Sequence, residues 1–126
     1  MIKKVFSTGR APGAIGPYSQ AVMAGGLIYT SGQIPIDPAT GSLVRDSVEK
    51  EASRVLENIK CIIEEAGSSL EKVLKVTVYL TDLRDFEAVN RVYAGYFDKT
   101  PPARSCIQAA ALPKGVRVEM DAVALL

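Results

Sequence analysis

The sequence predicts an α+β fold in which a mixed β-sheet is covered on one face by two helices. Three observations point to this class. Two stretches repeat apolar residues at three- and four-residue spacing, as amphipathic helices do, and one stretch alternates between apolar and polar residues, as a half-buried strand does. Several other short apolar stretches are bounded by glycine and proline, so the predicted element order is β-β-β-α-β-α-β-β.

The chain has 126 residues, and we expect them to form one domain, 1–126. Its fifteen basic and fourteen acidic residues nearly cancel, so composition indicates neither a nucleic-acid partner nor a membrane partner. No apolar stretch approaches the ~20 residues of a spanning helix, and no apolar core of a signal peptide follows the first lysines. We therefore expect a cytoplasmic protein.

The chain contains no histidine. Histidine-based acid–base catalysis, histidine zinc ligation and Ser-His or Cys-His nucleophile pairs are therefore excluded. The two cysteines, Cys61 and Cys106, lack metal-ligand spacing and are expected to be reduced thiols. We expect no metal site and no cofactor, so the chemistry must come from carboxylates, tyrosine, arginine, a thiol, backbone groups or bound water.

The amino-terminal quarter of the chain predicts three short strands and a loop. Residues 2–7 are expected to form an edge strand, and residues 7–18, which include three glycines and two prolines, an ordered loop. The stretches 19–24 and 27–31 flank Gly25-Gly26, a pattern typical of a two-residue β-hairpin.

A long connection over 33–47 precedes the first predicted helix. This helix is expected over 48–66, because one apolar stripe runs along it. Asp46 fits as the N-cap with Glu49 reaching back to it, and Gly67 fits as the carboxyl-terminal stop. The stripe consists of Val48, Ala52, Val55, Leu56, Ile59, Ile62, Ile63 and Ala66.

The strand and helix that follow are predicted from their periodicity. A half-buried strand is expected over 74–80 and a second helix over 83–97. Asn90 lies beside the apolar stripe of that helix, where its amide could serve a pocket or face solvent. The side chains expected to face the core are Leu74, Val76, Val78 and Leu80 of the strand, and Phe86, Val89, Val92, Tyr93, Tyr96 and Phe97 of the helix.

Two strands are predicted at the carboxyl end, over about 103–111 and 116–125, around a turn at 112–115. We expect them to pair with each other as a hairpin. Their residues are small or aliphatic on both sides, which suggests that the face of the sheet away from the helices is covered by other copies of the chain. A monomer with a well-covered last strand is the alternative.

Arg104 is far more polar than its neighbours in the first of these strands. It follows Pro101-Pro102, which favour an extended backbone, and its guanidinium is suited to binding a carboxylate or phosphate through two hydrogen bonds. The alternative is a structural ion pair with one of the fourteen acids. In the hairpin register, Arg104 and Cys106 share a face with Glu119, which lies opposite Gln108. Four residues at ~3.3 Å each separate Arg104 from Glu119 by roughly 13 Å, too far for a direct ion pair within one chain.

Three stretches resemble motifs of a known family: Ile15-Gly16-Pro17-Tyr18-Ser19-Gln20; Tyr29-Thr30-Ser31-Gly32-Gln33-Ile34-Pro35; and Pro102-Ala103-Arg104-Ser105-Cys106-Ile107 with Ala110, Leu112 and Val118-Glu119-Met120. Over essentially its whole length the chain resembles the RidA (YjgF) family of reactive-intermediate deaminases. The resemblance implies a chorismate-mutase-like fold. It also implies a homotrimer in which the sheets form a central barrel and three clefts lie between subunits.

The resemblance further implies hydrolysis of 2-imino acids, such as 2-iminobutanoate and 2-iminopropanoate, to 2-oxo acids and ammonia. These imines come from pyridoxal-phosphate dehydratases that act on threonine and serine. By the resemblance, Arg104 would bind the substrate carboxylate, Glu119 would hold the attacking water, and the main chain at Cys106 would contact the substrate. The other cleft residues, partly from a neighbouring subunit, would be Tyr18, Ser31, Gly32 and Asn90.

The residues suit this chemistry on physical grounds. An imine carbon is already electrophilic, so a catalyst needs mainly to hold the carboxylate and to place a water against the C=N carbon. One carboxylate can activate that water and then protonate the leaving nitrogen if its pKa lies near neutrality. The alternative for Glu119 is a surface ion pair with Arg117 or Lys114, and the alternative for Tyr18 is simple packing.

Two other functions remain open. One is an endoribonuclease or translation inhibitor, an activity reported for some family members. The absence of histidine and of a basic cluster argues against it, and against RNA as a partner. The other is a non-catalytic trimeric module that binds 2-oxo acids or similar metabolites and regulates a partner.

Overall fold

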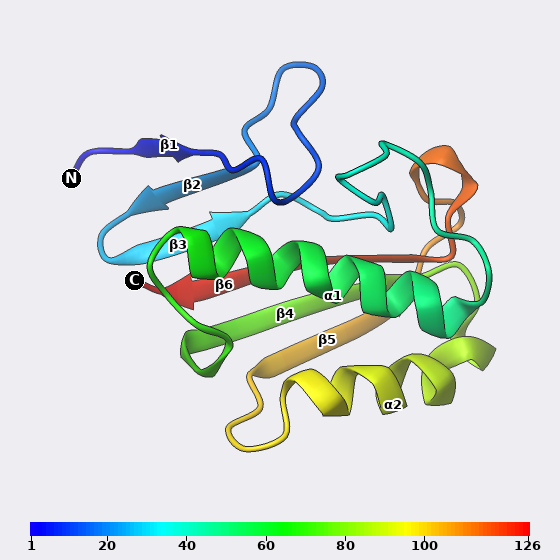
Figure 1. Cartoon of the computed structure of the whole chain (residues 1–126). Helices are drawn as coiled ribbons and strands as arrows, with labels where there is room; N and C mark the ends of the chain where they lie inside the picture. Colours follow the sequence, from blue (N-terminus) through cyan, green and yellow to red (C-terminus); the bar gives the residue numbers. More distant parts are fainter.

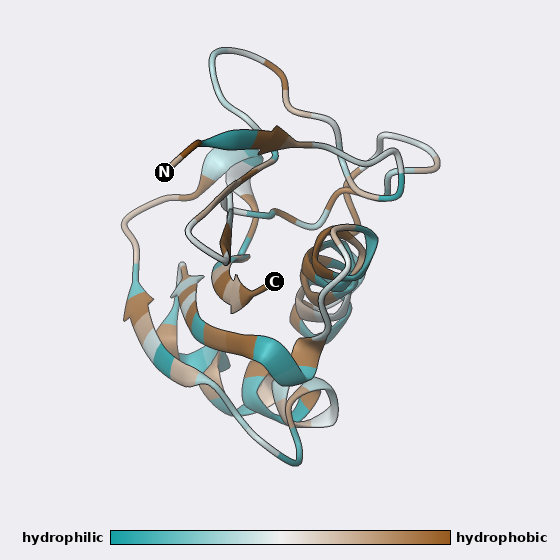
Figure 2. Ribbon diagram, turned by 90° about the vertical axis from the view of Figure 1, so that its left-hand side faces the viewer, coloured by the Kyte–Doolittle hydropathy of each residue, from teal (hydrophilic) through white to brown (hydrophobic).

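The computed structural model describes all residues, 1–126, and contains one six-stranded sheet of order β1-β2-β3-β6-β4-β5 and two α-helices. Both helices lie on the same face of the sheet in Figure 1 and in the view of Figure 2, where α1 is seen nearly end-on. The predicted α+β class with two helices on one face is confirmed. The strands are β1 Lys4–Phe6, β2 Ala21–Ala24, β3 Leu27–Thr30, β4 Val73–Leu80, β5 Ala103–Gln108 and β6 Val118–Leu125, and the helices are α1 Val48–Glu65 and α2 Phe86–Tyr96.

The predicted hairpin around Gly25-Gly26 joins β2 and β3, which pair antiparallel, and β1 pairs with the other side of β2. Gly25 has φ +59° and Gly26 has φ +78°. Two consecutive residues with positive φ form the turn whose twist matches that of the flanking strands, and glycine adopts this conformation without a steric penalty.

Helix α1 ends where the sequence predicts but begins with a different cap. Its N-cap is Ser47, whose side chain accepts a hydrogen bond from the Lys50 amide at 3.1 Å. The prediction of Asp46 as the cap is wrong because Ser47 has the extended backbone of a cap (φ −158°), and Asp46 instead forms an exposed ion pair with Lys50 at 3.7 Å. At the other end Gly67, with φ +92°, terminates the helix as expected.

Strand β4 lies between β6 and β5 and alternates between buried and less buried residues, as predicted. The exception is Leu74, which is 44% exposed. A register irregularity between Val73 and Lys75 shifts the pairing by one residue, and Val73 takes the buried position that Leu74 was expected to fill.

The prediction that the last two strands form a hairpin is wrong. β4 lies between them, with β5 parallel and β6 antiparallel to it. Residues 73–108 form a strand-helix-strand unit in which α2 connects two parallel strands, the usual route between parallel neighbours. The segment 109–117 then passes the end of β4 to reach β6. At its start, the Ala109 amide donates to the Leu80 carbonyl of β4. At its end, the Arg117 carbonyl accepts from the amide of Thr81, the residue after β4.

This topology places Arg104 and Glu119 on opposite faces of the sheet. Arg104 pairs with Val76, whose side chain is buried beneath the helices, so Arg104 lies on the helix face. In β6 the alternate residues Val118 and Met120 are buried on that same face, and Glu119 between them points to the other. The prediction that Arg104 and Glu119 share a face of the sheet is therefore wrong, because it assumed that their two strands pair directly as a hairpin.

The two helices bury their apolar stripes against the sheet. In α2, Val89, Tyr93 and Phe97 are buried, and Phe86, Val92 and Tyr96 pack against the same core, as predicted. No helix combines the length and apolar character that crossing a membrane requires. Three large apolar side chains are more than two-fifths exposed on the opposite face of the sheet: Tyr29 of β3, Ile107 of β5 and Leu125 of β6.

Candidate active site

The structure divides the predicted site residues into two groups. Tyr18, Ser31, Gly32 and Glu119 line one hollow of about 570 Å³. Arg104, Asn90 and Cys106 lie elsewhere, on the helix face of the sheet at its β5 edge. Within one chain Arg104 and Glu119 are separated by two strand spacings and by three residues along the strand, roughly 14 Å between backbones.

The backbone of the Glu119 hollow is held in place by hydrogen bonds. Gln33 and Met120 exchange backbone hydrogen bonds of 2.7 and 3.1 Å, which fix the segment containing Ser31 and Gly32 beside Glu119. The Ser31 hydroxyl donates to the Ser19 carbonyl at 2.5 Å. The hollow therefore has a rigid wall on the Ser31 side.

Buried polar side chains that the sequence analysis did not identify anchor the loops around this hollow. Gln20 is 2% exposed, accepts from the Thr8 amide at 2.8 Å and donates to the Pro12 carbonyl at 2.8 Å. Asn58 of α1 is fully buried and donates to the Ile34 and Ile36 carbonyls. Gln20 thereby orders the loop that ends at Tyr18, as predicted for residues 7–18, and Asn58 anchors the long connection.

The carboxylate of Glu119 has no hydrogen-bond or ion-pair partner within the chain. The structure has no ion pair of Glu119 with Arg117 or with Lys114, and Arg117 instead binds the buried Glu51 carboxylate at 2.5 Å. Partial burial raises the pKa of Glu119 above its usual value, and the neighbouring Asp121 carboxylate raises it further. A raised pKa favours the protonated form of this carboxyl group more than in a free glutamate, which suits a group that has to take and return a proton.

Gly32 gives the Glu119 carboxylate its room. A Cβ built at this glycine would overlap Oε2 of Glu119 and lie 3.0 Å from its Cδ, while the φ of Gly32 is one that alanine also adopts. Because the carboxylate occupies the space above Gly32, a side chain at this position would displace it.

For the imine hydrolysis that the family motifs implied, with Glu119 as the expected group that holds the water, we expect Gly32→Ala to lower kcat/KM about 100-fold, because a displacement of about 1 Å at such a group costs that much. The matched control is Gly13→Ala in the same hollow, where an added Cβ has no neighbour within 4 Å. Steady-state kinetics and thermal unfolding of both variants check this. Equal activity of the two variants would contradict the claim that the reaction depends on the position of the Glu119 carboxylate above Gly32.

At the β5 edge, the Arg104 guanidinium is exposed and pairs with no acid. Its Nη1 donates to Asn90 Oδ1 at 2.8 Å, and this is its one hydrogen bond within the chain. Its Cζ lies 4.8 Å from the ring centre of Tyr93 and 5.3 Å from that of Phe86. The structural ion pair that was the alternative for Arg104 is therefore absent, and most of its donors are free to bind an anion.

Cys106 lies two residues after Arg104 on the same face of β5 and is partly buried. Burial raises the pKa of its thiol, and the charge of Arg104 opposes that shift only in part. A raised pKa keeps the thiol protonated, which disfavours a nucleophilic role. Since β5 is one of the two edge strands of the sheet, the backbone groups on its outer side, those at Cys106 among them, lie along an edge that no other strand covers within the chain.

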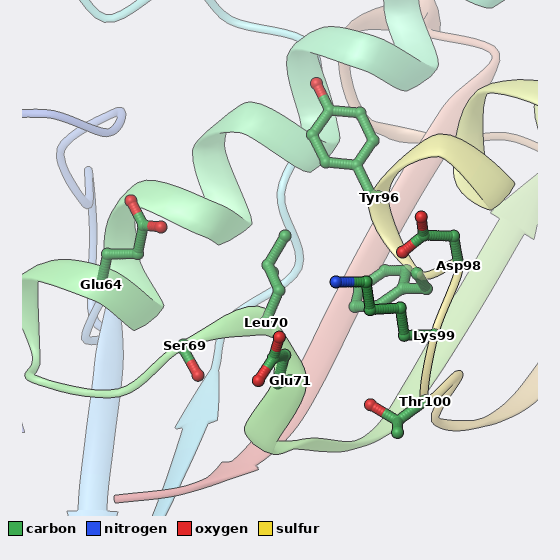
Figure 3. A pocket seen from close by; sticks show the side chains of 9 residues that line it. Glu64, Ser69, Leu70, Glu71, Tyr96, Asp98, Lys99 and Thr100 are labelled. Carbon is green, nitrogen blue, oxygen red and sulfur yellow. The ribbon is translucent and has the colours of Figure 1, made fainter.

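A second hollow, of about 560 Å³, lies between the end of α1, the short 3₁₀ turn Leu70–Lys72 and the loop after α2 (Figure 3). In Figure 3, Glu64 lies across this hollow from Asp98, Lys99 and Thr100. It contains none of the predicted site residues. No group of three or more potential metal-ligating side chains occurs in the chain.

The chain resembles several proteins along nearly its full length. The family that matches residues 8–126 is described as endoribonuclease L-PSP. The chain is 52% identical over 124 residues to a RutC family protein of Pyrococcus abyssi, with 98% of each chain covered. It is 50% identical over 125 residues to the human 2-iminobutanoate/2-iminopropanoate deaminase, covering 99% of this chain and 91% of that one. The crystal structure of Escherichia coli TdcF with bound serine matches with a TM-score of 0.93 and 48% identity, covering 98% of each chain.

These matches define the structural class of the protein: it has the α+β fold, with a six-stranded sheet and two helices, of the YjgF and L-PSP structures. The chain belongs to the RidA (YjgF) family, as its motifs indicated. Deaminases of reactive intermediates are named among its relatives.

Proposed function

We propose that the protein hydrolyses 2-imino acids, such as 2-iminobutanoate and 2-iminopropanoate, to 2-oxo acids and ammonia. We propose further that the active site lies between copies of the chain in a homotrimer, where Arg104 of one copy meets the hollow around Glu119 of another. The observation that supports this most is the presence of an unpaired guanidinium and an unpaired carboxylate on opposite faces of one sheet. Neither group alone binds and activates an imino acid, and within one chain they are too far apart to do so together.

In the proposed reaction, Arg104 binds the substrate carboxylate through two N–H donors, and the backbone at Cys106 contacts the substrate beside it. Glu119 accepts a proton from water as the water oxygen attacks the C=N carbon, and it passes this proton to the imine nitrogen. The product of this step has OH and NH₂ on one carbon. The C–N bond then breaks with its electron pair going to nitrogen, while Glu119 takes the hydroxyl proton and delivers it to the departing nitrogen, which leaves as ammonia.

The relatives support this assignment of substrate. The human relative at 50% identity is named for 2-iminobutanoate and 2-iminopropanoate. Serine, which is bound in the E. coli TdcF structure, has a carboxylate next to the carbon that bears its nitrogen, as 2-imino acids do. Pyridoxal-phosphate dehydratases acting on threonine and serine would supply such imines to a protein of this kind.

The family description favours endoribonuclease activity as a second candidate. The chain has no histidine and a net charge of +1, whereas metal-independent RNA cleavage and RNA binding usually rely on histidine pairs and a basic surface. RNA cleavage that is lost in both Arg104→Ala and Glu119→Ala would support this candidate over ours. Cleavage that survives both changes would indicate a contaminant or a separate site.

The direct test is to generate 2-iminobutanoate in situ with a threonine dehydratase and to follow the rate of 2-oxobutanoate formation. Wild-type protein is expected to accelerate this step in proportion to its concentration. The matched control for the Arg104→Ala variant is Arg91→Ala, which removes an exposed arginine of α2 that has no hydrogen bond or ion pair. This control should behave as wild type. Unchanged rates with and without wild-type protein would leave a non-catalytic binder as the function.

The pH profile of the reaction reports on Glu119. Because the ionised carboxylate is the base, we expect kcat/KM to fall on the acid side, with a limb above the usual glutamate pKa. Asp121→Asn removes the second cause of the raised pKa, so the limb should move to lower pH. A limb that stays in place in Asp121→Asn would contradict the assignment of the base to Glu119.

A further inference from the structure

We propose that Phe86 and Tyr93 form an aromatic platform that positions the Arg104 guanidinium for the carboxylate of the substrate, with Asn90 fixing its rotation. This inference rests on the proposed function and assigns positioning residues to it. The platform is the pair of rings beneath the guanidinium, whose centres lie 5.3 Å (Phe86) and 4.8 Å (Tyr93) from its Cζ.

The three residues come from one side of one helix. Phe86, Asn90 and Tyr93 are spaced four and three residues apart in α2, so their side chains are neighbours along its surface. α2 connects β4 to β5, and Arg104 is the second residue of β5. The strand-helix-strand unit thus brings the aromatic rings and the arginine together within one copy of the chain.

The contacts of Arg104 leave most of the in-plane N–H donors of its guanidinium free. Aromatic rings attract the flat face of a guanidinium, while carboxylates bind its N–H groups in the plane. Nη1 donates to Asn90 Oδ1 at 2.8 Å, and no other hydrogen bond of the guanidinium occurs within the chain. An exposed arginine would otherwise move among many rotamers, so a platform beneath it reduces the ordering required when the substrate binds.

The Tyr93 hydroxyl is not what holds the arginine. Tyr93 is only 5% exposed, and its buried hydroxyl has no hydrogen-bond partner. The ring of Tyr93 packs on Phe97, with 4.8 Å between their centres, which fixes its orientation beneath Arg104. The ring therefore supplies the contact, and phenylalanine should replace it.

The test is the kinetics of Tyr93→Leu, Phe86→Leu and Tyr93→Phe with 2-iminobutanoate. The two leucine variants should raise KM about 3- to 30-fold with a smaller change in kcat, the range of a cation–π contact. Tyr93→Phe retains the ring and should keep the wild-type KM. Phe86 is only partly buried, so Phe86→Leu gives a result even where Tyr93→Leu fails to fold.

A double-mutant comparison separates positioning from a general structural effect. In the Arg104→Ala background, Phe86→Leu should have no further effect on the residual kcat/KM, since the arginine that it positions is gone. An equal fold-loss in both backgrounds would overturn the inference, as would wild-type KM values in both leucine variants. Absence of turnover by the wild-type protein would instead overturn the proposed function, so the two failures are distinguishable.

Discussion

Replacement of Arg104 by alanine is expected to lower kcat/KM for 2-iminobutanoate about 100- to 10,000-fold, because two charge-assisted hydrogen bonds to the substrate carboxylate, each worth about 1.5–3 kcal/mol, are lost. Arg104 is exposed and has no acidic partner, so the free energy of unfolding should change by less than about 1 kcal/mol. The large effect should therefore fall on the reaction and not on the fold.

Arg104→Lys sharpens this prediction. Lysine retains the positive charge but not the planar pair of donors, so its activity should lie between those of wild type and Arg104→Ala. Arg91→Ala on the exposed side of α2 again serves as the matched control. Steady-state kinetics and circular dichroism of the three variants check these outcomes. An Arg104→Ala variant within threefold of wild type would show that the guanidinium does not bind the substrate.

Replacement of Glu119 by glutamine is expected to lower kcat about 100- to 10,000-fold, the contribution typical of a general acid–base group. The same change should stabilise the fold at neutral pH. The pKa of Glu119 is raised in the folded state, so its ionised form is disfavoured there, and the stability it gives at low pH is lost as pH rises through that pKa. Glutamine stays neutral and avoids this loss.

Thermal unfolding of wild type and Glu119→Gln at several pH values measures this second effect. The gain in Tm from glutamine should be small at acid pH, where Glu119 is protonated, and larger at neutral pH. A Glu119→Gln variant that loses activity and is also less stable than wild type at every pH would contradict this account. It would mean that Glu119 stabilises the fold, and that its ionised form does not lower the stability of the protein.

The elements of this fold could be predicted from the sequence because their signals are local. The apolar stripe of α1, the alternation in β4 and the double glycine between β2 and β3 each specify an element within a few turns or residues. Pairing of the last two strands was predicted wrongly, because a short turn with Pro113 and Gly115 looked like a hairpin. The order strand-helix-strand over 73–108 is typical of a crossover between parallel strands, and β4 and β5 do pair parallel.

The error in pairing propagated to the site. A hairpin register puts Arg104 and Glu119 on one face, whereas the inserted β4 puts them on opposite faces. Tyr18, Ser31, Gly32 and Glu119, which come from three separate motifs of the sequence, line one hollow in the structure. The buried Gln20 and Asn58 were missed, because no local pattern distinguishes a buried amide from an exposed one.

The measurement that tests the central claim most directly is subunit complementation between Arg104→Ala and Glu119→Gln. Each variant alone should be nearly inactive towards 2-iminobutanoate. In the proposed trimer, a site is intact where the copy that supplies its arginine carries only the Glu119 change and the copy that supplies its glutamate carries only the Arg104 change. Random assembly from equal amounts of the two variants gives this in about a quarter of the sites.

We therefore expect co-assembled variants to recover about a quarter of the wild-type rate per site, with native mass spectrometry confirming that mixed assemblies have formed. Mixed assemblies that are no more active than the two parents would contradict a site shared between copies of the chain.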